Sequence, residues 1–125
     1  MSKKAFVSSK IPAIGPYSSA VEANGFIFLS GQIPVNPATG EIISDINDAT
    51  RQVLVNIQSL LGEMGLTLSN VVKTTIFLKK MSDFPVVNEI YAGFFAQEPP
   101  ARSTVEVSDL PKGAPLEIEA VAIKG

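Results

Sequence analysis

Two residues in the last quarter of the chain have the types and spacing for chemistry, Arg102 and Glu117. Arg102 opens the strand-like run 102–107, Glu117 lies near the start of the run 116–123, and a Pro/Gly loop joins the two runs. A guanidinium binds a carboxylate through two parallel hydrogen bonds, and a nearby carboxylate can hold and deprotonate water. If the two runs return on each other like a hairpin, the pair forms a small site for an acid-bearing molecule and a water.

Alternation along the two runs predicts the side of the sheet on which these residues lie. Arg102 and Thr104 share one side of their strand, and Val105 and Val107 share the other. If the valines face the helices, Arg102 points away from them, and Glu117 likewise points away from its apolar strand neighbours. We therefore expect Arg102 and Glu117 to meet on the side of the sheet opposite the helices.

The same residues have a simpler interpretation. Arg102 and Glu117 could form a structural ion pair, or each could be a solvated strand end, and residue types alone favour this second interpretation. Glu119 shares the alternation of Glu117, so alternation does not choose between the two carboxylates. The other arginine, Arg51, lies near the start of a predicted helix, where we expect it to be solvated.

Composition excludes several classes of function. The chain has 125 residues, a formal net charge of −2, and neither histidine nor cysteine. Zinc sites that need these ligands, cysteine nucleophiles and Ser-His-Asp triads are therefore impossible. The chain has no excess of basic residues that would attract nucleic acid. It also has no run of about 18 apolar residues, so no membrane span is predicted. The absence of cysteine and of a signal peptide predicts a cytoplasmic protein.

The elements that must position the site follow from caps, turns and periodicity. Asp45 predicts the N-cap of a long helix that Gly65 ends, and Ser82 predicts the cap of a second helix. The dipeptide Asn24-Gly25 predicts a hairpin turn. The predicted strands are 5–7, 20–23, 26–30, 71–78, 102–107 and 116–123. This order predicts a single α+β domain over residues 1–125, with two helices on one face of a sheet.

The strands are apolar on both sides, which predicts an assembly. Residues 26–29 are apolar at every position, and the runs 71–78 and 116–123 carry apolar side chains on both sides. Two helices can cover only one face of such a sheet, and a large bare apolar face is rarely tolerated on a monomer. We therefore expect a homo-oligomer in which another subunit covers the second face.

Four separated motifs give this chain its resemblance to the RidA (YjgF) family of enamine/imine deaminases. The matching segments, in chain order, are Ile14-Gly-Pro-Tyr-Ser18, Leu29-Ser-Gly-Gln-Ile-Pro-Val-Asn-Pro37, residues 84–95, and Pro100-Ala-Arg-Ser-Thr-Val followed by Leu116-Glu-Ile-Glu-Ala120. The resemblance implies a ferredoxin-like protomer with a mixed sheet, related in fold to the chorismate mutases of the barrel type. It also implies a homotrimer with three clefts between neighbouring subunits.

The resemblance also implies residue roles. Arg102 would bind the substrate carboxylate, and Glu117 would orient the hydrolytic water. The other implied cleft residues are Tyr17, Ser30, Gly31, Asn88 and the backbone of Thr104. Many family members have cysteine at the position of Thr104, which leaves the backbone contact possible. Taken alone, Tyr17 could be an ordinary loop aromatic and Asn88 an ordinary surface residue of a helix.

The implied reaction is hydrolysis of reactive 2-enamine and 2-imine acids, such as 2-aminoacrylate, 2-iminopropanoate and 2-iminobutanoate, to 2-oxo acids and ammonia. A protonated imine is already electrophilic, so no metal or cofactor is expected. The alternative is a non-catalytic protein that binds a 2-oxo acid or has a regulatory role, including translation inhibition. Chorismate mutase chemistry rests on fold analogy alone. Because Tyr17 or Asn88 could come from a neighbouring subunit, we expect assembly and activity to be lost together.

Overall fold

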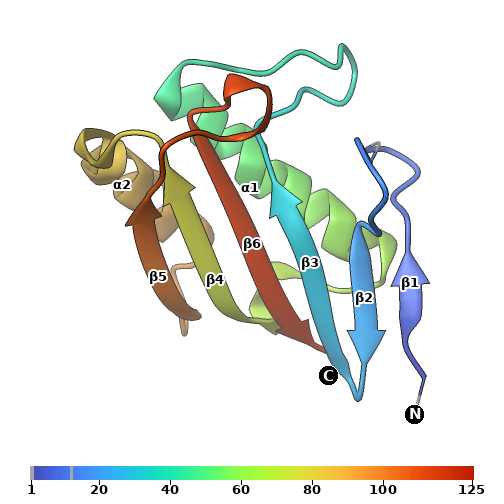
Figure 1. The fold of residues 1–125 in the computed structure, drawn as a ribbon. Coiled ribbons are helices and arrows are strands. Elements are labelled where there is room, and N and C mark those ends of the chain that lie inside the picture. Colours follow the sequence, from blue (N-terminus) through green and yellow to red (C-terminus); the bar gives the residue numbers. More distant parts are fainter. Residues whose placement is uncertain (1, 12) are drawn as a thin grey trace.

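A six-stranded sheet carries two helices on one face, as the computed structural model shows for residues 2–11 and 13–125 (Figure 1). The elements follow in the order β1 (Lys4–Phe6), β2 (Ala20–Ala23), β3 (Phe26–Gln32), α1 (Ile46–Glu63), β4 (Val71–Leu78), α2 (Phe84–Phe94), β5 (Ala101–Glu106) and β6 (Leu116–Ile123). Short 3-10 turns lie at Leu68–Asn70, Met81–Asp83 and Pro111–Gly113. The predicted α+β class with two helices on one face is confirmed.

The strand order is β1-β2-β3-β6-β4-β5, and only the β4–β5 pair is parallel. The predicted hairpin-like return of the last two strands is therefore wrong, because β4 lies between β5 and β6. The reason is the β4–α2–β5 crossover, which places β5 beside β4 in the parallel direction. The connection after β5 then brings β6 to the other side of β4, where it pairs with β3.

Most of the predicted boundaries agree with the structure. The bounds of β2, β4 and β6 are as predicted, β1 and β5 begin one residue early, and β3 runs two residues longer. Asp45 caps α1, because its Oδ2 accepts a hydrogen bond from the Asp48 backbone N at 3.0 Å. Gly65 follows α1 with a φ of 76°, in the left-handed region that closes many helices.

The predicted cap of the second helix is wrong. Ser82 lies inside a 3-10 turn, and α2 begins two residues later at Phe84. Asp83 precedes the helix, with no side-chain hydrogen bond to its first turn. Pro85 in the first turn has a fixed φ and needs no hydrogen-bond partner for its nitrogen, so this helix starts without a polar cap.

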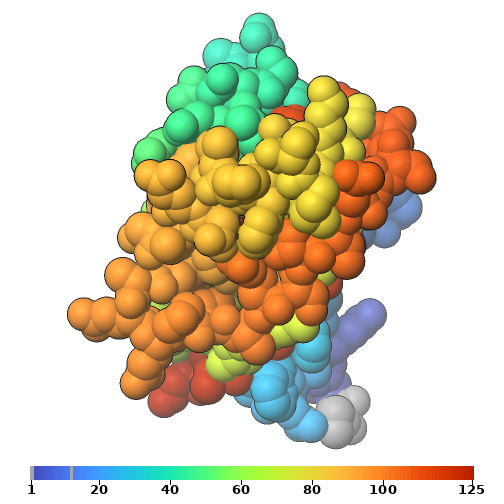
Figure 2. Space-filling model, turned by 90° about the vertical axis from the view of Figure 1, so that its left-hand side faces the viewer, coloured from blue at the N-terminus to red at the C-terminus, as the bar shows by residue number. Residues whose placement is uncertain are grey.

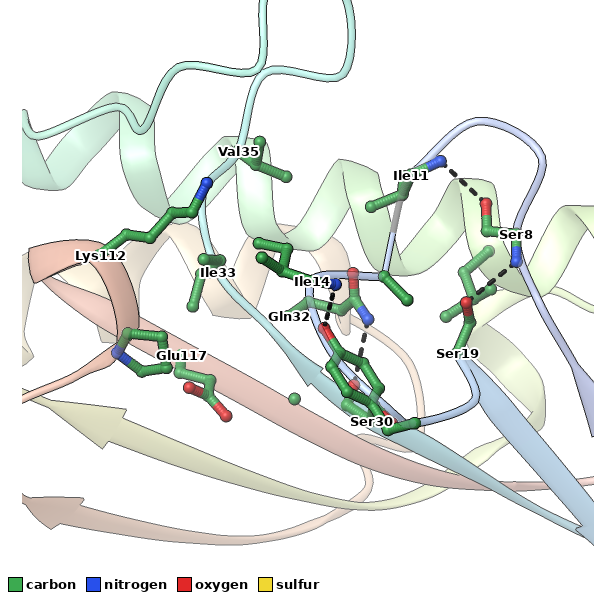
Figure 3. A pocket seen from close by; sticks show the side chains of 15 residues that line it. Ser8, Ile11, Ile14, Ser19, Ser30, Gln32, Ile33, Val35, Lys112 and Glu117 are labelled. Carbon is green, nitrogen blue, oxygen red and sulfur yellow. Dashed lines mark hydrogen bonds between the residues drawn. The ribbon is translucent and has the colours of Figure 1, made fainter.

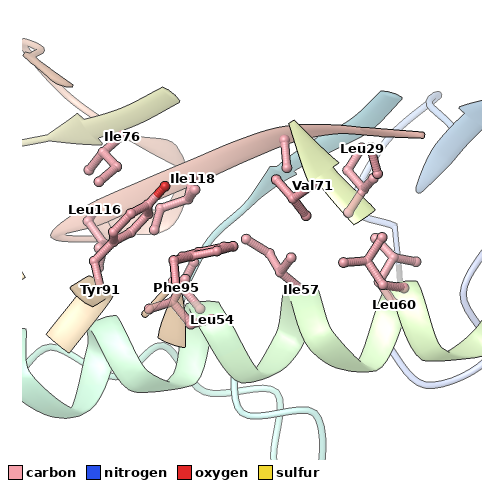
Figure 4. Close-up of a cluster of buried hydrophobic side chains, with 14 of the residues drawn as sticks. Leu29, Leu54, Ile57, Leu60, Val71, Ile76, Tyr91, Phe95, Leu116 and Ile118 are labelled. Carbon is pink, nitrogen blue, oxygen red and sulfur yellow. The ribbon is translucent and has the colours of Figure 1, made fainter. Parts of the chain in front are cut away.

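The core lies between the helices and the sheet (Figure 4). The largest of its fully buried apolar side chains are Ile27, Leu54, Ile57, Leu60, Leu61, Ile76, Leu78, Leu116 and Ile118. One polar pair lies among them, the Thr74 and Tyr91 hydroxyls at 2.6 Å. Every buried side-chain nitrogen or oxygen among the described residues has a hydrogen-bond partner, so this core has no polar defect.

The opposite face of the sheet is apolar and exposed. Phe26, Phe28, Val105 and Ile123 point away from the helices and are each about two-fifths exposed or more, at 45%, 49%, 41% and 40%. The sheet is therefore apolar on both faces, as predicted, and its cover by a second subunit stays a prediction. No helix in the described part of the chain is long and apolar enough to cross a membrane.

Candidate functional site

A cavity of about 370 Å³ opens at one end of the sheet (Figure 3). Its walls come from the segment before β2, the end of β3 and the residues after it, helix α1, the turn before β6, and β6 itself. Four of the residues that the sequence singles out line this cavity: Tyr17, Ser30, Gly31 and Glu117. Segments far apart in the chain therefore bring these four residues into one site.

Glu117 is the carboxylate that lines the cavity. Its carboxylate is half-buried and points into the cavity (Figure 3), and no residue in the described ranges donates a hydrogen bond to it. Burial, and secondarily the neighbouring charge of Glu119, raise the pKa of Glu117 above its ordinary value. A carboxylate with a raised pKa and free oxygens is suited to take a proton from water.

The absence of a side chain at Gly31 leaves room for the Glu117 carboxylate. The β3–β6 register shifts between Leu29 and Gln32, so Ser30 and Gly31 form an irregularity in the sheet beside Glu117. A Cβ on residue 31 would overlap Oε2 of Glu117. Glycine is therefore the residue that lets this carboxylate lie against the strand.

Ser30 and Tyr17 shape the cavity through backbone contacts. The Ser30 hydroxyl donates to the Ser18 carbonyl at 2.6 Å, so its proton is used within the fold. The Tyr17 hydroxyl accepts from the Ile14 backbone N at 3.3 Å, and the Tyr17 side chain is 47% exposed. Both residues line the cavity, and their roles in binding substrate stay predictions.

The segment that forms one wall is held by a residue that the sequence did not single out, Glu63 at the end of α1. Its carboxylate accepts hydrogen bonds from Ser8 Oγ at 2.6 Å, Ser9 N at 3.0 Å and Ser9 Oγ at 2.9 Å. Burial acts to raise the pKa of Glu63, but these hydrogen bonds and Lys10 outweigh it and lower that pKa. The only sequence signal is an acidic residue at a helix C-terminus, where the helix dipole disfavours it.

Arg102 lies elsewhere, on the helix side of the sheet. Its NH1 donates to Asn88 Oδ1 at 2.9 Å, and its guanidinium carbon lies 5.3 Å and 5.0 Å from the ring centroids of Phe84 and Tyr91. The predicted orientation is therefore wrong. Arg102 pairs in register with Thr74, whose side chain is buried on the helix face, so both residues point to that side.

The physical reason for the error is the position of β5 at the sheet edge. The helix layer does not require apolar residues along the whole of this strand, so its valine Val105 faces away from the helices and is 41% exposed. Thr104 pairs with Ile76, so it shares the side of Arg102. The side of the molecule formed by α2 and β5 is shown in yellow to orange in Figure 2.

The residues predicted to form one site therefore lie in two separate groups within a single chain. Arg102, Asn88 and Thr104 lie on the α2–β5 side of the sheet, whereas Glu117 belongs to the cavity group on the other side of β4. The two groups do not form one cleft in a single chain.

The cavity also contains a cation that the sequence did not single out. Lys112 lies in the turn before β6 and lines the cavity near Glu117 (Figure 3). Its φ of 56° is unusual for a residue with a side chain. The sequence feature that could have pointed to Lys112 is the turn-forming sequence Pro-Lys-Gly in which it lies. Among the described residues, no group of three or more metal-ligating side chains could hold an ion.

The sequence and the fold of this chain match those of a known family. Residues 7–124 match the family described as Endoribonuclease L-PSP. A solved structure from Yersinia pestis, described as a member of the conserved Rid protein family, superposes with a TM-score of 0.94 at 48% identity, over 98% of this chain and 100% of that chain. The chain therefore belongs to this family, and its resemblance to the RidA (YjgF) proteins is confirmed.

Two further relatives have informative names. The 2-iminobutanoate/2-iminopropanoate deaminase of Escherichia coli K12 is 44% identical over 127 residues, which cover 99% of each chain. The structure of E. coli TdcF with bound serine has a TM-score of 0.92 at 40% identity, over 98% of this chain and 99% of that chain. One relative is thus named for deaminase activity, and another binds a small amino acid.

Proposed function

We propose that this protein hydrolyses 2-imino acids and their enamine tautomers to 2-oxo acids and ammonia. The observation that carries the proposal is the half-buried Glu117 carboxylate, which faces a cavity and has a raised pKa. The deaminase name of the E. coli relative supports the same reaction. The substrates we propose are 2-aminoacrylate, 2-iminopropanoate and 2-iminobutanoate.

The reaction needs little from the protein. Water adds to the carbon of the protonated imine while Glu117 accepts the proton from that water, and a carbinolamine forms. Glu117 then returns this proton to the amino nitrogen, and the carbon–nitrogen bond breaks while Glu117 takes the hydroxyl proton. Ammonia and the 2-oxo acid leave, and Glu117 releases its proton to water. The protein contributes orientation and charge stabilisation, and no metal or cofactor takes part in this proposal.

Arg102 would hold the substrate carboxylate from a neighbouring subunit. Within one chain, Arg102 lies on the other side of β4 from Glu117. A homotrimer that packs the α2–β5 side of one subunit against the cavity of the next would complete the site. The guanidinium is already oriented by Asn88 and two aromatic rings, so little side-chain entropy would be lost on binding.

A second function, binding of a small acid without turnover, is favoured by one specific observation. The related TdcF structure contains bound serine, an amino acid with the carboxylate that Arg102 would recognise.

RNA cleavage, which the family's description suggests, is not what we propose, because the chain has no histidine and a net charge of −2. The absence of cysteine fits the cytoplasmic location that we propose.

The experiment couples the full chain to a threonine dehydratase and follows the disappearance of the imine by chemical trapping. Arg102→Ala should abolish the acceleration while the oligomer stays intact, whereas the exposed Arg51→Ala should leave it unchanged. Glu117→Gln should bind 2-oxobutanoate but lose turnover, which separates catalysis from binding alone. Full turnover by Arg102→Ala would refute the site, and full turnover by Glu117→Gln would refute its acid–base role.

The pH dependence has a definite sign. The pKa of Glu117 is raised, and the reaction needs its ionised form. The value of kcat/KM should therefore fall on acidification through a pKa above the ordinary 4.5 of a glutamate. A pH–rate profile measured with pre-formed imine checks this, and Glu117→Gln should lack the transition.

A further inference from the structure

The cavity extends well beyond the groups that the proposed reaction uses. Glu117 and Lys112 lie at one end, and Ser8 and Ser19 lie at the other (Figure 3). Between these ends the walls are mainly aliphatic, formed by Ile11, Ala13, Ile14, Ile33, Val35 and Leu60. The charged groups of the cavity are thus confined to one end of a largely apolar space.

The volume is large for the smallest substrates. A water molecule takes about 30 Å³ of liquid, so the cavity of about 370 Å³ has room for about a dozen atoms of similar size. The 2-iminopropanoate ion has only a methyl group beyond its imine carbon. When such an ion lies beside Glu117, most of the aliphatic part of the cavity stays unfilled by substrate.

The chemistry orients the substrate in this space, and this step rests on the proposed function. The carboxylate must lie toward a cation, either Lys112 at the rim or Arg102 of a neighbouring subunit. The imine carbon must lie beside Glu117. The side chain then points along the aliphatic walls toward Ser8.

We propose that the aliphatic part of the cavity is a subsite for long apolar side chains. The substrate class it favours is 2-imino acids with an unbranched or branched aliphatic side chain of about four carbons. The walls suit this ligand, because the Ile33, Val35 and Leu60 side chains that line this part of the cavity are aliphatic. Such walls gain stability when a ligand's methylene groups replace water against them.

The test is a binding series that needs no turnover. The affinities of the full-length protein for pyruvate, 2-oxobutanoate, 2-oxopentanoate and 2-oxohexanoate are measured by calorimetry at one pH. Burial of a methylene contributes about 0.8 kcal/mol, or about fourfold in Kd, so three added methylenes should tighten binding on the order of fiftyfold. The chain-length gain should stop once the side chain fills the space.

Matched variants test whether the gain in affinity with chain length comes from the aliphatic part of the cavity. Val35→Phe fills the aliphatic part, so it should remove most of the chain-length gain and leave pyruvate binding within about twofold. Val55→Phe makes the same change on the exposed side of α1, outside the cavity, and should keep the full gain. If Val35→Phe unfolds, Ile14→Trp is the second variant, because Ile14 also lines the cavity but is 51% exposed.

The outcomes separate this inference from the proposed function. Equal affinity for all four acids would overturn the subsite, and so would a gain that survives both Val35→Phe and Ile14→Trp. Hydrolysis of 2-iminopropanoate alongside flat affinities would leave the proposed function standing. A chain-length gain in a protein that hydrolyses no imine would support the subsite and refute the proposed function.

Discussion

Glu117 owes its position to a residue that has no side chain. The Glu117 carboxylate lies where a Cβ of residue 31 would be, at the irregular step between β3 and β6. The overlap involves the flexible end of a glutamate side chain and no backbone atom. A larger residue at position 31 would therefore displace the carboxylate and leave the fold in place.

Gly31→Ala should thus reduce activity with little effect on stability. We expect the free energy of unfolding to change by less than about 1 kcal/mol, while turnover falls about a hundredfold through loss of the placed base. Urea unfolding and the imine-trapping assay measure the two quantities. Gly62→Ala on α1, where a Cβ meets no atom within 4 Å, is the control and should keep full activity.

The position of the Arg102 guanidinium depends on its contact with the Tyr91 ring. Tyr91→Leu removes one of the two rings beneath the guanidinium, and we expect KM to rise about two- to tenfold, because cation–π contacts contribute about 0.5–2 kcal/mol. Tyr91→Phe keeps the ring and removes the hydroxyl bonded to Thr74, so it should change stability and leave KM near wild type. Equal KM values for the two variants, both far from wild type, would argue against the ring contact.

At the scale of elements, the end of α1 holds the segment that forms one wall of the cavity. Glu63 accepts three hydrogen bonds from Ser8 and Ser9, and Ser8 Oγ in turn accepts from the backbone N of Lys10 and Ile11. This network connects a helix terminus to a loop more than fifty positions away. The wall is therefore part of the folded structure rather than a free terminus.

Glu63→Ala should lower the free energy of unfolding by about 1–2 kcal/mol at pH 7, because hydrogen bonds to a charged acceptor are lost. The pKa of Glu63 is lowered in the folded state, so its contribution is present above the ordinary 4.5 and is lost as the pH falls through the lowered value. Urea unfolding at pH 7 and pH 3 should show a smaller difference at pH 3. Glu89→Ala, on the exposed side of α2, is the control, and a difference that does not depend on pH would contradict this account.

At the scale of the whole molecule, the exposed sheet face and the divided site have one explanation. Phe26 and Phe28 pack with ring centroids 6.4 Å apart on a face that the helices leave bare. The groups of Arg102 and Glu117 lie apart in one chain. The homotrimer that we propose, which would bury the bare face and join the two groups, would account for both observations.

Assembly and activity should therefore be lost together. Phe28→Asp places a charge on the bare face, so we expect monomers and no acceleration of imine hydrolysis, as measured by light scattering and the trapping assay. Val55→Asp makes a similar change on α1 and should leave both unchanged. An active monomer of Phe28→Asp would contradict the divided site.

Mixed oligomers test the division directly. Arg102→Ala and Glu117→Gln chains are each expected to be inactive, but clefts that combine the intact residue of each should work. Random assembly of equal amounts would restore about a quarter of the wild-type activity, since each cleft needs two independent choices. No recovery after verified subunit exchange would place both residues in one chain's site.

Local sequence patterns were enough to predict most of the helices and strands and to select four residues that line the cavity. Caps, turns and alternation act over a few residues, so Asp45, Asn24-Gly25 and the bounds of β4 and β6 could be read locally. Family motifs then selected Tyr17, Ser30, Gly31 and Glu117, which the structure places around one cavity. These inferences needed no knowledge of how distant strands pair.

The face of the sheet on which Arg102 lies depends on how distant strands pair. The β4–α2–β5 crossover makes β5 an edge strand in register with β4, and that register turns Arg102 toward Asn88 and away from Glu117. Alternation predicts which residues share a side but not which side faces the helices, because an edge strand is not obliged to bury its valines. The contacts of Glu63 and Lys112 likewise depend on long-range packing, for which the local sequence carried almost no signal.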